Sequence, residues 1–332
     1  MRIKMRKHFI YFAAVIFLAV MGMTGCGNKS NSQDLQVRIG YFNNITHAQA
    51  LLMKADGSLE EALGEDIGVK WKAFNAGPAE VEAFFADELD IGYIGPVPAI
   101  TANVKSEGDV QVLAGAAKGG SVLVVREGSG VASVEDLSGK TVAIPQIGNT
   151  QHLCLLSLLK ENGLKPVTSG GDVVVSAVVN ADVANIMGRG DIDAALVPEP
   201  WGTTLLRSGA QLILDYNEIY LNGMYDVAVV VVRKDFLEKH SDIVEIFLEQ
   251  HHRATESINT NSDEVLQRIN KELLDETGKS LSDDVIKEAF ERIVVSTEVN
   301  EESMERFAEI SFDEGIIRKT PGKEQLYAAG AE

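Results

Sequence analysis

The chain has 332 residues, enough for one large or two medium-sized domains with a sizeable core. Its 49 acidic residues outnumber its 30 lysines and arginines, which gives a net charge of −19. A protein this acidic lacks the positive surface that nucleic acid requires, and its own charge does not draw it to anionic lipid.

The first 25 residues have the layout of a secretory signal. A basic start is followed by an apolar run over residues 9–23, too short for a membrane span, and then by small residues that lead into Cys26. This end resembles the lipobox of bacterial lipoproteins, which implies a lipid on Cys26 and a flexible tether over residues 26–35. The alternative is a plain signal peptide with an incidental cysteine. We expect an extracytoplasmic protein that the lipid anchors to the cell membrane, and Cys154 then has no disulfide partner.

Short β-type runs alternate with helical patterns along the rest of the chain. In the first half we expect helices that begin near residues 47, 77 and 96, and strands over residues 37–42, 68–74, 91–94, 110–116 and 121–126. In the second half we expect helices that begin near 149, 183 and 201, and strands over 141–144, 173–178, 194–197 and 227–232. From Ser241 the pattern is helical without a strong strand, and this tail is expected to pack back on an earlier domain. The alternation predicts parallel sheets with helices on both faces.

Two segments of the chain end in the same way. Residues 85–98 and residues 186–200 each run from a helix end through an acidic residue and a strand to a Pro-x-Pro turn. This predicts two similar α/β lobes. Because ligands of open parallel sheets bind beyond the carboxyl ends of the strands, two such ends that face each other form a cleft.

The first candidate site is the start of the helix near residue 149. Asn149 or Thr150 can cap this helix, and Gln151 lies in its first turn. A helix N-terminus presents free N–H groups and about half a positive charge, so it attracts anions. The alternative is an ordinary N-cap without a ligand.

Two further turns carry candidate residues. Gly95, Pro96 and Val97 start another helix, where proline suits the first turn, although they could simply mark a turn. After the first strand come short polar groups in a loop, Asn43, Asn44, Thr46 and His47, which can face a ligand. The alternative is that they cap the next helix, with His47 a solvated residue of its first turn.

The last candidates are Gly120 and Ser121, at the junction of two predicted strands, and Glu199 and Trp201, after a later strand. Gly120 and Ser121 can bring backbone N–H groups close to a ligand, or they belong to a flexible loop. Trp201 can form a flat apolar wall, as is typical of small-ligand pockets. Glu199 either pairs with an amine on a ligand or caps the next helix, and we favour the cap.

The sequence offers little for catalysis. His152 lies on one helix face with three leucines, and Cys154, two residues on, points in a different direction. No zinc spacing, phosphate loop or serine elbow is present, so we expect no metal, no cofactor and no enzyme activity.

In this order and spacing, several segments of the chain are similar to solute-binding proteins of ABC importers, in the branch for nitrate, taurine and aliphatic sulfonates. These segments are Gly40-Tyr41-Phe42 with Asn44-Ile45-Thr46-His47, residues 89–96, residues 134–142, Gly148-Asn149-Thr150, and Glu199-Pro200-Trp201. The resemblance implies the two-lobed α/β fold of type II periplasmic binding proteins, with a mostly parallel sheet in each lobe and a ligand cleft between them. It places lobe 1 at residues 36–123 and 227–332, lobe 2 at 124–226, and the crossing strands near 123–127 and 226–230.

The resemblance also implies a function. The protein is expected to act as a monomer, to capture a small anion such as an alkanesulfonate or taurine by hinge closure, and to deliver it to the transmembrane subunits of a permease. Nitrate, bicarbonate or a thiamin-precursor pyrimidine are alternative ligands. An alternative of a different class is a secreted enzyme of the same fold with a reactive Cys154 or His152.

Overall fold

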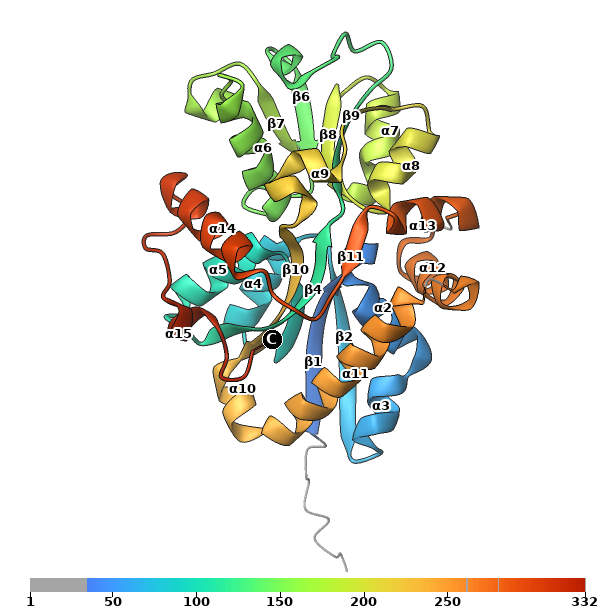
Figure 1. Ribbon diagram of the computed structural model, residues 1–332, viewed down its shortest axis with the longest axis vertical. Coiled ribbons are helices and arrows are strands. Elements are labelled where there is room, and N and C mark those ends of the chain that lie inside the picture. Colours follow the sequence, from blue (N-terminus) through green and yellow to red (C-terminus); the bar gives the residue numbers. More distant parts are fainter. Residues whose placement is uncertain (1–34, 261, 280, 332) are drawn as a thin grey trace, which may run out of the picture. The chain divides into compact units, whose positions relative to one another are not determined.

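The computed structural model describes residues 35–260, 262–279 and 281–331 of the chain. The predicted signal and Cys26, the predicted lipidation site, lie outside these residues, as does the predicted tether except Leu35. None of the helices that the structure describes is both long and apolar enough to cross a membrane. The described chain folds into two β-sheets flanked by helices (Figure 1).

The first sheet has six strands, which come from the first part of the described chain and from its last part. Its strands are, in spatial order, β11 (Ile293–Val295), β4 (Val110–Gly119), β10 (Asp226–Arg233), β3 (Ile91–Ile94), β1 (Leu35–Phe42) and β2 (Ile67–Phe74). β1 and β3 are parallel, whereas β10 is antiparallel to both of its neighbours, β3 and β4. Because β10 lies between two strands and under helices, its valine run is buried.

The second sheet has five strands and occupies the upper part of Figure 1. In spatial order they are β7 (Val174–Ala177), β6 (Thr141–Ile144), β8 (Ala194–Pro198), β5 (Ser121–Val125) and β9 (Gln211–Leu214). β6 is parallel to β7 and β8, but β5 is antiparallel to β8 and β9.

Both sheets are therefore mixed, where the sequence predicted mostly parallel ones. The antiparallel pairs involve β4, β5 and β10, the strands on either side of the chain's passages between the sheets. β9 was not predicted, since a four-residue run that is largely exposed gives a weak pattern. β11 is a three-residue strand in the tail, where no strand was expected, and it pairs with the edge of β4.

The chain passes between the sheets at two points. The first passage is at Gly119 and Gly120, whose φ angles of +72° and +73° favour glycine. It comes before the predicted crossing at residues 123–127, because β5 already pairs within the second sheet from Ser121. The return runs through α9 (Tyr216–Ile219) and a 3₁₀ turn to the start of β10 at Asp226.

Helices cover the first sheet on two sides (Figure 1). On one side α2 (Ala48–Asp56) packs against α11 (Ser241–Asn259) and α12 (Asp263–Thr277), with α3 (Ser58–Leu63) beside them. On the other side lie α4 (Gly77–Phe85), α5 (Pro96–Lys105), α14 (Glu301–Asp313) and α15 (Lys323–Leu326). The C-terminal helices thus pack back on the N-terminal part of the chain.

Shorter helices complete the described structure. The second sheet is flanked by α6 (Thr150–Glu161) on one side and by α7 (Val183–Gly188) and α8 (Trp201–Arg207) on the other. α10 (Lys234–Lys239) leads from β10 into α11, and α13 (Asp283–Phe290) packs against α8.

The position of α4 depends on two glycines. Glu80 of α4 is fully buried against Gly40 of β1 and Gly92 of β3, where a Cβ atom on either glycine would overlap its carboxyl group. Burial raises the pKa of Glu80 well above its usual value, so this carboxyl is neutral. The two glycines thus let α4 pack closely across β1 and β3.

Candidate binding site

A small cavity lies at the carboxyl ends of strands from both sheets, where parallel sheets place their ligands. We call it the central cavity. Its volume is about 20 Å³, and its lining residues are Phe42, Asn44, Thr46, His47, Asn75, Ala76, Gly77, Gly95, Pro98, Pro145, Asn149, Thr150, Gln151, Asn180, Pro198 and Val227. A volume of this size holds about one water molecule, so a larger ligand requires the walls to move apart.

Three helices begin at the central cavity. α4 begins after Ala76 and α5 after Gly95, both with a proline in the first turn, and α6 begins after Asn149. First-turn N–H groups have no carbonyl partner within their own helix, and each helix start carries about half a positive charge. Each helix start therefore contributes partial positive charge at the cavity, although none of the lining residues is Lys or Arg.

The helix starts meet through glycines. A Cβ atom at Gly95 would lie 2.5 Å from Oγ1 of Thr150, and a Cβ atom at Gly77 would overlap the ring of Pro98. Only glycine lets α5 of the first sheet approach α6 of the second this closely. This contact brings the first-turn N–H groups of α5 and α6, two helices that flank different sheets, close together.

The start of α6 is ordered by a chain of hydrogen bonds. Oδ1 of Asn149 accepts from the N–H of His152 at 2.9 Å, which is the predicted N-cap. Nδ2 of Asn149 donates to Oε1 of Gln151 at 2.9 Å, and Nε2 of Gln151 donates to Oγ of Ser121 at 3.0 Å. Asn149 is thus both a cap and part of the cavity wall.

The hydroxyl group of Thr150 is available to bind a ligand. Its side chain is buried, and Oγ1 has no hydrogen-bond partner among the described residues. Buried hydroxyl groups are ordinarily paired, and an unpaired one costs about 1–3 kcal/mol. This hydroxyl can donate to an acceptor in the cavity.

The opposite wall is polar and uncharged. Oγ1 of Thr46 donates to Oδ1 of Asn44, and the backbone N–H of Phe42 donates to Nδ1 of His47 at 3.1 Å. Burial lowers the pKa of His47 to about 3, so its imidazole is neutral. Because the lining also contains no Asp or Glu, an anion meets dipoles and N–H groups without a repelling charge.

A second cavity, which we call the side cavity, adjoins the central one. It has a volume of about 40 Å³ and shares Asn44, Asn75 and Asn180 with the central cavity. Its other lining residues are Asn43, Phe74, Val179, Ala181, Trp201 and Thr277. The structure places Trp201 here and not against the helix starts.

Glu199 lines neither cavity. Its side chain is fully buried and accepts from the N–H of Thr203 at 2.9 Å and from Oγ1 of Thr203 at 3.0 Å, which makes it a cap of α8. The guanidinium of Arg292 lies 3.6 Å away. Burial raises the pKa of Glu199 to about 7, against the opposing effects of Thr203 and Arg292.

The remaining predicted residues stand behind the wall. Ser121 reaches the cavity through Gln151. Gly120 does not line the cavity, but a Cβ atom there would touch Thr46 at 3.4 Å. Pro96 and Val97 start α5 and point into its buried surroundings, so they shape the turn without lining the cavity.

The two residues considered for catalysis do not pair with each other. Nδ1 of His152 accepts from the N–H of Gly148 at 3.1 Å, and burial lowers its pKa to about 4. Burial raises the pKa of the Cys154 thiol to about 12, which keeps it protonated and a poor nucleophile. Among the residues that the structure describes, no three His, Cys, Asp or Glu side chains gather where they could hold a metal ion.

Several lining residues were not predicted. Asn75 and Ala76 connect β2 to α4, Gly77 starts α4, and Asn180 belongs to the turn after β7. The signal for the first group was the same as at Gly95, a glycine and a proline between a strand and a helix. Asn180 follows an exposed strand, and no sequence pattern points to it.

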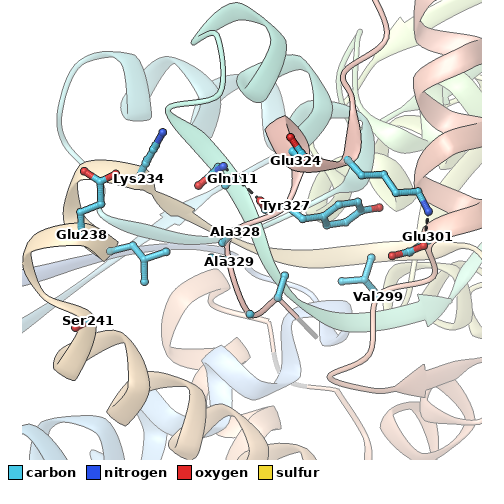
Figure 2. A pocket seen from close by; sticks show the side chains of 14 residues that line it. Gln111, Lys234, Glu238, Ser241, Val299, Glu301, Glu324, Tyr327, Ala328 and Ala329 are labelled. Atoms are coloured by element: carbon cyan, nitrogen blue, oxygen red, sulfur yellow. Dashed lines mark hydrogen bonds and ion pairs between the residues drawn. The ribbon is translucent and has the colours of Figure 1, made fainter.

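A larger hollow lies elsewhere, between α10 and the C-terminal segment (Figure 2). Its volume is about 690 Å³, and Gln111, Lys234 and Tyr327 are among its lining residues. Lys323 there is paired with Glu301 at 2.6 Å, and Glu238 and Glu324 add negative charge. Three glutamates and two lysines line the hollow, whereas the central cavity has no Asp or Glu in its lining, so an anion meets less repelling charge in the central cavity.

Comparisons with curated proteins point to binding proteins. The chain is 31% identical to the taurine-binding periplasmic protein of Escherichia coli over 217 residues, which are 65% of this chain and 64% of that protein. The match therefore spans just under two thirds of that relative. The chain is also 29% identical to the putative aliphatic sulfonates-binding protein of Bacillus subtilis, over 89% of this chain and 83% of that protein.

Solved structures share the fold. The periplasmic aliphatic sulphonate binding protein of Escherichia coli matches with a TM-score of 0.69 at 23% identity, over 89% of this chain and 92% of that one. The periplasmic nitrate-binding protein of Synechocystis matches with a TM-score of 0.67 at 12% identity, over 87% and 83%. These likenesses confirm the predicted periplasmic-binding-protein fold. The model of the NMT1-like family matches residues 30–270, most of the chain, and the chain belongs to this family.

Proposed function

We propose that this chain is the extracytoplasmic solute-binding protein of an ABC importer and that its ligand is an aliphatic sulfonate. The observation that carries the proposal is the meeting of three helix N-termini from both sheets at a buried cavity without a charged side chain. The named functions of the relatives in Escherichia coli and Bacillus subtilis support the choice of ligand class.

A sulfonate suits this chemistry. It stays ionised at any pH of interest and accepts hydrogen bonds without giving any, as first-turn N–H groups and the unpaired Thr150 hydroxyl require. The net charge of −19 works against long-range attraction of an anion. Binding then depends on local dipoles in a site from which water is excluded.

Capture requires a change of shape. The central cavity is too small for a sulfonate with its alkyl group, so the walls separate to admit it and close around it. We place the lobes at residues 36–123 with 227–332 and at residues 124–226. The chain passes between the sheets at Gly119–Gly120 and again just before Asp226, and these two passages are the natural hinge.

The proposed location and partners follow from the same role. A lipid on Cys26 holds the monomeric protein at the outer face of the cell membrane, and residues 26–35 give it reach. The transmembrane subunits of the permease are its protein partner.

Calorimetry across ligand classes tests this proposal. We expect ethanesulfonate to bind the purified protein, and nitrate, bicarbonate and a thiamin-precursor pyrimidine to bind at least about tenfold more weakly, since they lack either the tetrahedral anion or the charge. A preference for nitrate or for the pyrimidine would reassign the ligand within the same transport role. Failure of all four to bind would contradict the role itself.

A further inference from the structure

The side cavity contains polar atoms that nothing in the described structure satisfies. Oδ1 of Asn43, Oδ1 of Asn180 and Nε1 of Trp201 are buried, and none has a hydrogen-bond partner among the described residues. Trp201 is 6% exposed, and its ring packs in the apolar core of the second sheet with Val122 and Val197. A small space therefore holds one fixed donor and two acceptors whose hydrogen bonds are unmade.

The side cavity is also uncharged. Its lining contains no Asp, Glu, Lys, Arg or His. Glu199, which the sequence offered as the partner of a ligand amine, is held by Thr203 and lies outside the lining. The ammonium of Lys279 donates to the carbonyl of Ala181, one of the lining residues. An ammonium group in this cavity would lose its water without gaining a counter-charge.

A hydroxyl group matches these atoms. It accepts from the N–H of Trp201 and donates to an amide oxygen of Asn43 or Asn180. If either amide is turned over, the hydroxyl accepts from its NH₂ group in place of donating. A methyl group can fill the space but leaves all three polar atoms unpaired.

We propose that the side cavity is the subsite for the far end of the ligand, and that it selects a short sulfonate with a terminal hydroxyl, such as 2-hydroxyethanesulfonate. The sulfonate lies at the helix starts of the central cavity, and the hydroxyl enters the side cavity past the shared Asn44, Asn75 and Asn180. The inference rests on the proposed function and names the ligand within it. It disfavours taurine, in which an ammonium stands in place of the hydroxyl.

Calorimetry with 2-hydroxyethanesulfonate, ethanesulfonate and taurine tests the subsite on the purified protein at one pH. We expect 2-hydroxyethanesulfonate to bind at least about tenfold more tightly than ethanesulfonate, and taurine to bind most weakly. Equal affinities for the first two ligands, or tightest binding of taurine, would overturn the subsite while the proposed function stands. If none of the three sulfonates binds, the proposed function fails and the subsite with it.

Variants assign the effect to the named atoms. Trp201→Phe keeps an aromatic ring but removes the N–H, and it should lower the ratio of affinities for 2-hydroxyethanesulfonate and ethanesulfonate by about tenfold. The matched control is Trp71→Phe, because Nε1 of Trp71 donates to Glu60 and lines neither cavity. This control should leave the ratio unchanged. Asn180→Ala, in a surface turn, should also lower the ratio, and an unchanged ratio in both Trp201→Phe and Asn180→Ala would contradict the proposal.

Discussion

Thr150 combines burial with an unmade hydrogen bond at the point where the two sheets meet. Its hydroxyl oxygen would be only 2.5 Å from a Cβ atom at Gly95, so the contact depends on the absence of a side chain at the residue that precedes α5. Asn149 shows the opposite case, since its amide oxygen accepts from His152 and its amide nitrogen donates to Gln151. At the scale of residues, buried polar atoms without a partner indicate where a ligand binds, and those with partners keep the cavity wall in place.

Replacing Thr150 with Val separates these roles. The valine has nearly the same shape and removes a hydroxyl that has no partner in the described structure, so we expect the thermal midpoint to stay within about 2 °C. A hydrogen bond to a charged ligand contributes about 1.5–3 kcal/mol, so affinity for ethanesulfonate should fall about 10- to 100-fold by calorimetry. Thr204→Val is the matched control, since its hydroxyl donates to Pro200 and lines neither cavity. Unchanged affinity in Thr150→Val would remove this hydroxyl from the site.

The residue types at the helix starts were predictable from the sequence, but their pairing was not. A strand followed by a capping residue or a Gly-Pro turn indicated the starts of α5 and α6, and the cap at Asn149 has the predicted form. Glu199 and Trp201 are neighbours in the chain, yet one caps α8 and the other lines the side cavity. Which of two adjacent side chains faces a cavity depends on tertiary packing, and local sequence patterns contain no information about it.

At the scale of elements, α13 and α8 form a contact between the two sheets. α13 contacts β11 of the first sheet and packs against α8, which flanks the second sheet. Arg292, in the turn between α13 and β11, donates to Oγ1 of Thr203 at 3.0 Å and to Oδ1 of Asp215 at 3.0 Å. It also supplies the positive charge near the buried Glu199. This arginine therefore compensates a carboxylate that α8 needs for its cap.

Arg292→Leu should destabilise the protein strongly. At pH 8, above the Glu199 pKa of about 7, the change leaves an ionised carboxylate buried without its cation, and loss of one partner of a buried pair costs about 3–5 kcal/mol. Arg207→Leu serves as the control, because Arg207 also pairs across these helices, with Glu288, but is 57% exposed and should contribute less than about 1 kcal/mol. Urea unfolding measures both. Equal losses in the two variants would show that the buried position of Glu199 does not matter.

Asp226 makes the stability of the fold depend on pH in a predictable direction. It is buried at the start of β10, and burial raises its pKa from 3.8 to about 7, although Lys118 opposes the shift. A carboxyl whose pKa is higher in the folded than in the unfolded state stabilises the fold at low pH, and this contribution is lost as the pH rises from about 4 to about 7.

The variant Asp226→Asn isolates this contribution. The stability of the parent minus that of the variant should fall between pH 5 and pH 7 and stay level above pH 8 in urea unfolding. The buried histidines, whose lowered pKa values act in the opposite sense, are present in both proteins and cancel in the difference. A difference that stays constant across this range would mean that Asp226 does not titrate as proposed.

At the scale of the whole molecule, the alternation of strands and helices predicted the fold class, and the periodic runs located most elements. What it missed has physical reasons. The strands next to the passages between the sheets run antiparallel, and β9 and β11 are too short to show a period. The side cavity could not be predicted, because it joins Asn43, Asn180 and Thr277 from distant parts of the chain.

A substitution at Cys26 tests the proposed lipid anchor. Cys26→Ala removes the sulfur that would carry the lipid, so the protein should move from the membrane fraction to the soluble extracytoplasmic fraction. Cys154→Ala is the control, since Cys154 is buried in α6 and cannot carry a lipid in the folded protein. Immunoblots of the two fractions give the result. Retention of Cys26→Ala in the membrane would exclude this anchor.

A crystal structure of the protein with ethanesulfonate tests the central claim most directly. We predict that the sulfonate oxygens lie within hydrogen-bond distance of the first-turn N–H groups of α6 and of Oγ1 of Thr150, with α4 and α5 aimed at the same group and no Lys or Arg in contact. The ethyl group should point toward Trp201. A sulfonate bound in the open hollow near Tyr327, or one held by an arginine or lysine, would contradict the account.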